Sequence, residues 1–257
     1  MKIQGRPPAS GLGRGCVDMI IRQGGNAAVI DTDSNLGTAA TTEVGPSMKF
    51  LHRDITITQS VADAIKTTLD WAQEAGKPIG GIITAAGTGS PCMLLDAARV
   101  PCSYEHMEIV LNVNLRGTLN PIRQLLPHLA AVSREGPDGE RGVVIMVASS
   151  AAFEGQSDLV VYSGSKGAVV SMTLPMARNL GQHGIRVVTI VPGLFETGMT
   201  APMRPQDREM LTAAMEFPRR PRMPEEFARL VKEAIGNTML NGEVIRLDGG
   251  ATLPKVF

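Results

Sequence analysis

Short apolar runs alternate with longer amphipathic stretches along this chain, and this alternation restricts the possible folds more than any other feature. The run GVVIMVASS is apolar without interruption, which is typical of a strand buried on both faces of a sheet. Strands of this kind, joined by helices, predict an α/β fold with a doubly wound parallel sheet in three α/β/α layers. The expected strands lie at 27–31, 48–54, 80–87, 142–150, 184–193 and 242–250.

Four stretches between these runs have helical spacing of apolar residues, and we expect helices over 60–76, 104–132, 161–184 and 224–237. The second is long and contains Pro121 and Pro127, which we expect to kink or divide it. The polar segment 133–142 has the composition of a surface loop. Without an internal repeat or a linker, residues 1–257 are predicted to form a single domain.

Charge and cysteine content exclude several classes of protein. Lysines plus arginines number 25, as do aspartates plus glutamates, which argues against a dedicated partner in nucleic acid or at a membrane surface. The three cysteines have no metal-ligand spacing, so no metal site is predicted, and their odd number is typical of a reducing compartment. No run approaches the ~20 apolar residues of a membrane span, and no signal or transit peptide is recognisable. We therefore expect a soluble intracellular protein.

The glycine-rich segment ASGLGRG at 9–15 is typical of a phosphate-binding turn. Gly11 and Gly13 would let the backbone approach a phosphate closely, and a helix beginning here would direct its amino terminus at a pyrophosphate. Asp31 ends the next predicted strand, 20 positions after Gly11, where an acid would bind the adenosine ribose hydroxyls. A carboxylate there favours NAD over NADP. The alternative role for Asp31 is that of a helix N-cap or turn residue.

A second constellation follows the run at 142–150. Tyr162 and Lys166 are four residues apart and share a helix face, and Ser149 ends the preceding strand. A nearby ammonium lowers the pKa of a phenol, so Tyr162 could exchange a proton with a hydroxyl or carbonyl whose oxygen Ser149 holds. A nicotinamide would exchange the hydride. The alternative is a buried tyrosine packed beside a lysine with only a structural role.

Taken together, these motifs resemble the short-chain dehydrogenase/reductase family over essentially the whole chain. The resemblance implies a Rossmann-type fold in which Ser149, Tyr162 and Lys166 are catalytic, with Ser149 and Tyr162 holding the substrate. Asn114, in NVNLRG, matches the residue that completes a proton relay. TAAG at 84–87 matches the family's turn only loosely. By family position, the cofactor-binding residues are Ser10, Leu12, Asp31, Asp54, Ile55, Ala85, Tyr162, Lys166, Phe195 and Thr197.

Several longer segments narrow the resemblance to the type-2 3-hydroxyacyl-CoA dehydrogenases, also called 17β-hydroxysteroid dehydrogenase type 10; they include YSGSKGAVVSMTLPMARNL and LNGEVIRLDGG. This subfamily implies NAD-dependent oxidation of short-chain 3-hydroxyacyl-CoA or of some steroids, a place in fatty acid metabolism, and a homotetramer. It also implies a cytoplasmic or mitochondrial matrix location.

Segment 198–222 corresponds to the family's substrate lid. Its four methionines suit either a flexible apolar pocket wall or an ordinary core. Arg219, Arg220 and Arg222 could meet the phosphates of coenzyme A, with solvated side chains as the alternative.

The chain departs from the family pattern before Gly11. Arg6 and Pro7 stand where the family has threonine and its first glycine, and only MKIQG precedes them. A central strand tolerates proline poorly because proline cannot donate a ladder hydrogen bond. Either KIQG forms a stunted first strand, or the strand and the first glycine are missing, and we favour the second interpretation. This departure leaves a non-catalytic scaffold subunit as an alternative to an enzyme, beside the alternative of a hydroxysteroid or other small-ketone dehydrogenase.

Overall fold

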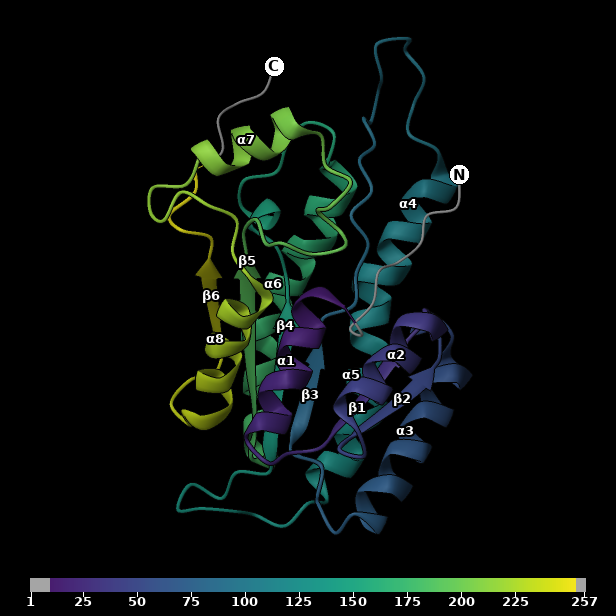
Figure 1. The fold of residues 1–257 in the computed structure, drawn as a ribbon, viewed down its shortest axis with the longest axis vertical. Coiled ribbons are helices and arrows are strands. Elements are labelled where there is room, and N and C mark those ends of the chain that lie inside the picture. The colour runs from purple at the N-terminus through teal and green to yellow at the C-terminus, as the bar shows by residue number, and fades with distance from the viewer. Residues whose placement is uncertain (1–9, 253–257) are drawn as a thin grey trace.

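The computed structural model describes residues 10–252, and all six predicted strands are present within them (Figure 1). They pair in parallel as two sheets, with orders β1-β2 and β3-β4-β5-β6. The α/β prediction is therefore confirmed. The strands are β1 (Ala27–Asp31), β2 (Met48–His52), β3 (Gly81–Thr84), β4 (Gly142–Val147), β5 (Ile185–Pro192) and β6 (Glu243–Leu247).

Helices connect these strands and cover both faces of the larger sheet. The four predicted helical stretches are all helical, with a division of the second one that is described below. The helices are α1 (Gly11–Arg22), α2 (Ser34–Val44), α3 (Thr58–Glu74), α4 (Tyr104–Leu111), α5 (Gly117–Ala130), α6 (Val160–Leu180), α7 (Pro205–Ala213) and α8 (Pro224–Gly236). None of those within residues 10–252 is long and apolar enough to span a membrane.

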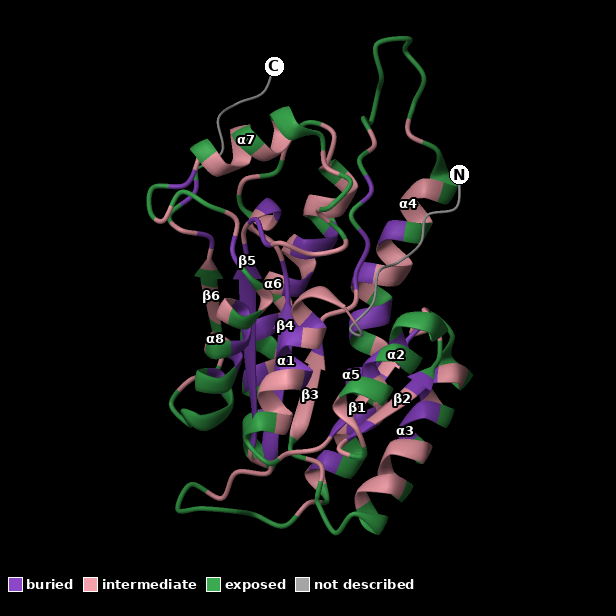
Figure 2. Ribbon diagram, viewed as in Figure 1, coloured by how far each residue is buried: buried purple, intermediate pink, exposed green. Residues whose placement is uncertain are grey.

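Successive side chains of β4 and β5 point to opposite faces of the sheet, so they pack against the helices of opposite layers. Val144 and Met146 of β4 pack with residues of α5 and α6, whereas Val143 and Ile145 pack with residues of α1 and α8. Both strands are buried along their whole length, as the uninterrupted apolar runs predict, and Figure 2 shows them as the buried centre of the fold.

Helix α1 packs against both sheets and is a link between them. Its Cys16 belongs to the core cluster of the four-stranded sheet, and the next residue, Val17, belongs to the cluster around β1 and β2. Among the described residues, β1 pairs only with β2, and β3 pairs only with β4, so no strand joins the two sheets there (Figure 1). The predicted defect concerns the KIQG segment, Arg6, Pro7 and Pro8, and these residues lie outside the described part of the chain.

The structure corrects the expected division of the second helical stretch. Pro121 and Pro127 both lie inside α5, which runs through them unbroken. The division instead falls at a π-helical segment, η1 (Asn112–Arg116), between α4 and α5. Apolar residues of α5 at helical spacing, including Ile122 and Leu129, pack into the core of the sheet. We infer that this packing outweighs the cost of the two missing N–H groups.

Candidate active site

The predicted site residues gather at the carboxyl ends of the parallel strands, which is the usual location of ligand sites in open α/β sheets. Asp31 is the last residue of β1, and Ala85 follows β3 directly. Ser149 lies two residues beyond β4, and Phe195 lies three residues beyond β5. Strand order therefore brings these residues to one edge of the molecule, although they are far apart in the sequence.

Tyr162 and Lys166 stand one turn apart near the start of α6, as predicted. A side-chain hydrogen bond joins Tyr162 to Ser149. The Lys166 Nζ atom lies 6.0 Å from the centre of the Tyr162 ring and donates a hydrogen bond of 3.0 Å to the Val147 carbonyl. The structure thus brings the three predicted catalytic side chains together at the end of β4.

Burial perturbs both titratable groups of this cluster. Desolvation raises the pKa of the Tyr162 phenol, and the hydrogen bond from Ser149 acts in the opposite direction. Desolvation also lowers the pKa of Lys166 to about 8. The sequence predicted a lowered Tyr162 pKa, but the net shift in this structure is upward, because desolvation outweighs the hydrogen bond from Ser149.

Asn114 lies in the π-helical segment η1 and is completely buried. Its Nδ2 donates to the Thr88 carbonyl at 3.0 Å and to Ser165 Oγ at 3.1 Å, and its Oδ1 accepts from the Thr88 N–H at 2.8 Å. Ser165 Oγ in turn donates to the Tyr162 carbonyl at 2.6 Å. Asn114 therefore ties the loop after β3 to the helix turn that holds Tyr162. π-Helical segments are often found at functional sites.

Two glycines form a cradle at this edge of the molecule, and Gly87 lies next to the cluster. Gly11 opens α1 with a φ of +56°, and a Cβ atom on it would lie 3.2 Å from Thr197. A Cβ atom on Gly87 would lie 3.2 Å from Asn114 Oδ1 and 3.4 Å from Lys166 Nζ. The first turn of α1 contains no acidic residue that would offset the favourable interaction of its amino terminus with an anion. The described part of the glycine turn fits a pyrophosphate-bearing cofactor.

Asp31 is buried, and its Oδ1 accepts the Asp33 N–H at 2.7 Å. The N-cap of α2 is Asp33, which accepts from Asn35 and Leu36, so the N-cap role belongs to Asp33. The hydrogen bond from the Asp33 N–H to Asp31 is the turn contact that the other alternative for Asp31 predicts. Asp54 closes a turn by accepting from the N–H and the hydroxyl of Thr56.

The other predicted cofactor residues lie around the same edge. Ile55 packs closely against Gly117, so that a Cβ atom added to this glycine would lie only 2.8 Å from the Ile55 side chain. Phe195 is buried and packs edge-on against Phe227, with ring centres 6.0 Å apart, and its carbonyl accepts a hydrogen bond from the Thr200 hydroxyl at 2.6 Å. Leu12 and Ala85 pack against the same core cluster, and Ser10 precedes α1 as its N-cap.

Segment 198–222 contains α7 and lies at the same end of the sheet. Met203 and Met215 pack in a small core with Leu194, whereas Met199 is exposed and would contact a side chain placed at Gly89. The interpretation as ordinary core is therefore correct for Met203 and Met215, and the interpretation as a pocket wall stays a prediction for Met199.

The three arginines of this segment differ in their surroundings. Arg220 forms two hydrogen bonds of 2.8 Å with Glu226, and Arg222 is buried, with its Nη1 atom lacking a hydrogen-bond partner. Arg219 is the most exposed of the three and donates to the Met215 carbonyl at 3.1 Å. This distribution leaves Arg219 as the best placed to meet an external phosphate.

One feature that the sequence analysis did not find is a pairing of cysteines. Cys92 and Cys102 form a disulfide in the long hairpin between β3 and α4, with a Cα–Cα distance of 6.0 Å. Their ten-residue separation resembles no common motif, so the sequence held no signal for this pairing.

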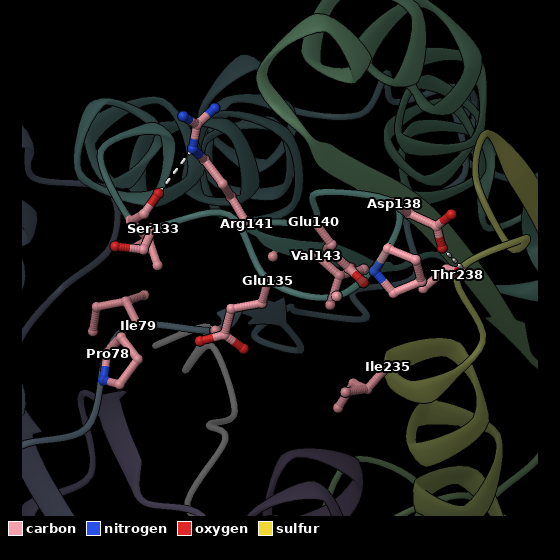
Figure 3. Close-up of a pocket in the computed structure, with 15 residues that line it drawn as sticks. Pro78, Ile79, Ser133, Glu135, Asp138, Glu140, Arg141, Val143, Ile235 and Thr238 are labelled. Atoms are coloured by element: carbon pink, nitrogen blue, oxygen red, sulfur yellow. Dashed lines mark hydrogen bonds between the residues drawn. The ribbon is translucent and has the colours of Figure 1, made fainter.

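A hollow on the surface lies away from these residues. A pocket of about 320 Å³ opens at the amino ends of β3 and β4, opposite the candidate site, and is lined by Pro78, Gly142 and Ile235 among others (Figure 3). Thr238 donates to Asp138 across one wall at 3.0 Å. No predicted site residue lines it, so we do not assign the active site there.

Parallel strands in an α/β fold, with a Ser-Tyr-Lys cluster and a glycine cradle at their carboxyl ends, are typical of a nicotinamide-dependent oxidoreductase. A family model described as short chain dehydrogenase matches residues 8–208, and the chain belongs to this family. It is 39% identical over 242 residues to 3-hydroxyacyl-CoA dehydrogenase type-2 of Drosophila melanogaster, covering 94% of this chain and 93% of that protein.

Two solved structures support the assignment. A 3-hydroxyacyl-CoA dehydrogenase type-2 from Mycobacterium avium superposes with a TM-score of 0.90 at 28% identity, covering 97% of this chain and 95% of that chain. A 3-ketoacyl-(acyl-carrier-protein) reductase from Brucella melitensis, complexed with NADH, has a TM-score of 0.80 at 25% identity and covers 95% of both chains.

Proposed function

We propose that this protein is an NAD-dependent dehydrogenase that oxidises the secondary alcohol of a short-chain 3-hydroxyacyl-CoA to a ketone. The observation that carries the proposal is the joining of Ser149, Tyr162 and Lys166 at the end of β4. The substrate class is supported by the 39% identity, over nearly the whole chain, to a relative named for that activity.

Proton transfer is the task that these side chains can perform. Ser149 holds the reacting oxygen, and the Tyr162 phenol exchanges its proton with it. Burial keeps the phenol protonated, which suits donation to a ketone. Oxidation of the alcohol needs the phenolate, which a charged Lys166 stabilises. The nicotinamide, when bound, supplies or accepts the hydride.

The cofactor would lie along the edge formed by the ends of β1, β3, β4 and β5. The amino terminus of α1, opened by Gly11, suits the pyrophosphate, and Thr197 suits the carboxamide side. The buried carboxylate of Asp31 would accept hydrogen bonds from the ribose and would repel a 2′-phosphate. We therefore propose NAD and not NADP as the cofactor. Ser10, Leu12, Asp54, Ile55, Ala85 and Phe195 complete the proposed site.

The same relatives also suggest a substrate lid, an oligomeric state and a cellular location for this protein. Segment 198–222 is proposed as the substrate lid, with the exposed Met199 facing the loop after β3. A homotetramer is supported by apolar side chains left exposed on the helices, including Tyr104 at 68% and Leu174 at 47%. We also propose a role in fatty acid metabolism and a location in the cytoplasm or mitochondrial matrix.

A substrate panel tests this proposal. The purified protein is given NAD or NADP with 3-hydroxybutyryl-CoA, a longer 3-hydroxyacyl-CoA or a hydroxysteroid, and the reduced cofactor is followed. We expect the highest kcat/KM with NAD and the short acyl-CoA. A preference for the hydroxysteroid would replace the substrate class but keep the chemistry. The absence of turnover with every substrate would overturn the proposal and favour a scaffold role.

A further inference from the structure

The long hairpin between β3 and α4 carries a cluster of side chains that the proposed reaction does not use. Cys92 and Cys102 lie on its two arms, and His106 lies in the first turn of α4 directly after it. One potential ligand atom of each residue lies within 4.8 Å of the other two. Two sulfurs and an imidazole at this spacing can converge on one ion, and these are the ligands that zinc and other thiophilic cations prefer.

Main-chain contacts hold the arms of the hairpin in register. The Cys102 N–H donates to the Leu94 carbonyl at 3.1 Å, and Leu95 forms an antiparallel bridge with Pro101. The Cys92 N–H donates to the Asp158 carbonyl at 2.7 Å, in the segment that leads into α6. The two sulfurs are therefore brought together by the backbone as well as by their covalent bond.

The position and orientation of His106 are fixed by two further contacts. Its backbone N–H donates to the hydroxyl of Ser103, the N-cap of α4, at 3.2 Å, which fixes the position of the residue in the first turn. Its ring Nε2 lies 3.1 Å from the Ser90 carbonyl. Because a carbonyl only accepts, Nε2 carries the proton in this contact, and Nδ1 of the neutral ring keeps its lone pair. A hydrogen bond of this kind commonly orients a histidine that ligates a metal.

We propose that Cys92, Cys102 and His106 form a redox-conditional binding site for a thiophilic divalent cation, with Zn²⁺ as the test ion. The oxidised form described above holds no thiolate. A dithiol reductant cleaves the S–S bond by exchange, so that each cysteine sulfur gains one electron and one proton while the reductant becomes a disulfide. Zn²⁺ then displaces the two thiol protons to solvent and is held by two thiolates and one neutral imidazole.

The charges and access of the cluster suit this ion. Two thiolates neutralise a divalent cation, and three protein ligands leave a fourth tetrahedral position for water. All three residues are half-buried, so an ion can reach them from solvent. The third cysteine, Cys16, offers a matched control: it is buried in the core, and desolvation raises the pKa of its thiol to about 12. It therefore provides no thiolate near neutral pH.

The test is equilibrium dialysis of the untagged full chain against Zn²⁺, with and without prior treatment with a dithiol reductant. The reductant is removed before dialysis, and the dialysis is carried out under anaerobic conditions. Metal content is counted by mass spectrometry. We expect one bound Zn²⁺ per chain after reduction and none in the oxidised form. Cys92→Ser and Cys102→Ser should lose at least tenfold in affinity, and Cys16→Ser should bind like the wild type. Thermal melts show whether each variant remains folded.

The His106→Ala variant separates this site from adventitious binding to a pair of reduced thiols. Its affinity for Zn²⁺ should fall at least tenfold although both cysteines remain. Substitution by Co²⁺ provides a second measurement, because sulfur-to-cobalt charge-transfer bands should vanish in the cysteine variants, and the ligand-field bands should shift in His106→Ala. Reduced wild type without bound zinc, or His106→Ala binding as tightly as the wild type, would overturn the proposal.

Discussion

The pKa values of Tyr162 and Lys166 depend strongly on how deeply the two side chains are buried. Burial disfavours the charged form of each, because it raises the pKa of the phenol and lowers the pKa of the ammonium to about 8. At neutral pH the phenol is therefore protonated, whereas Lys166, with a pKa of about 8, keeps most of its charge. The pattern YxxxK predicts that the two residues are neighbours, but it does not predict these pKa shifts, which depend on the buried strand behind the residues.

The lowered pKa of Lys166 predicts a dependence of stability on pH. Between pH 8 and 10 the native lysine loses its proton while the unfolded lysine, with a pKa of 10.5, keeps it. The unfolded state then binds more protons, so stability rises with pH through this window. Denaturant titrations should show the wild type gaining up to roughly 3 kcal/mol of unfolding free energy relative to Lys166→Met. Parallel pH profiles for the two proteins would contradict the shift.

Asp31 is expected to set the choice of cofactor. Asp31→Ala should lower kcat/KM with NAD by roughly tenfold to a hundredfold, the cost of losing hydrogen bonds to a charged group, and should improve NADP relative to NAD. Asp31→Asn is the matched control, because it removes the charge but keeps an oxygen to accept from the Asp33 N–H. If the wild type already prefers NADP in steady-state assays, the role assigned to Asp31 is wrong.

At the scale of elements, the buried strands were predictable because burial on both faces leaves an uninterrupted apolar run. β4 and β5 are buried at every position, and both were predicted from such runs. The position of the candidate site residues was predictable as well, because the spacing of the glycine turn, Asp31, Ser149, Tyr162 and Lys166 follows from the same strands and helices; their roles stay predictions. Strand order then brings them to one edge.

Elements whose form depends on tertiary contacts were less predictable. Helix α2 contains glycine and several threonines, and its clearest sequence signal is the N-cap Asp33. The unbroken α5 and the π-helical segment before it depend on packing and on the hydrogen bonds of Asn114. The disulfide hairpin depends on contacts with His106 and Asp158 that no local pattern indicates.

The separation of the two sheets leads to a prediction about the first strand. In the described residues, β1 and β3 each present one edge without a strand partner, and an unpaired buried polar group costs roughly 1–3 kcal/mol. Inserting a short Val/Ile-rich strand after Arg6, with Thr-Gly-Gly replacing Pro7 and Pro8, should raise both the melting temperature and the affinity for NAD. Thermal melts with and without NAD measure both effects.

An insertion of equal length made of glycine and serine is the control for that variant. It lengthens the chain equally but has neither the β-strand propensity nor the apolar side chains of a strand. It should therefore not raise the melting temperature. If the Val/Ile-rich insertion and the wild type melt at the same temperature and show the same shift with NAD, then KIQG is an adequate first strand and Pro7 is tolerated in the phosphate turn.

The whole molecule carries apolar surface that one chain does not cover. Large apolar side chains are exposed on α4, α5 and α6, including Tyr104, Leu119 and Leu174. Where exposed apolar side chains form a contiguous patch, they usually mark an interface between proteins, and we propose that role for these residues. We therefore expect a homotetramer at micromolar concentration, measured by light scattering. Leu174→Glu should shift the population towards smaller species, and a wild type that is already a stable monomer would contradict the expectation.

The proposed function requires Tyr162 to exchange the proton in NAD-dependent oxidation of a 3-hydroxyacyl-CoA. This role is tested by the initial rate of NAD reduction with 3-hydroxybutyryl-CoA, measured for the wild type, Tyr162→Phe and Tyr104→Phe. Tyr104 is the chain's other tyrosine, is exposed, and serves as the matched control. We predict that Tyr162→Phe loses about 10²–10⁴-fold in rate while binding NADH nearly as well as the wild type, and that Tyr104→Phe keeps its activity. Retention of more than half the wild-type rate by Tyr162→Phe would contradict the proposed role of Tyr162.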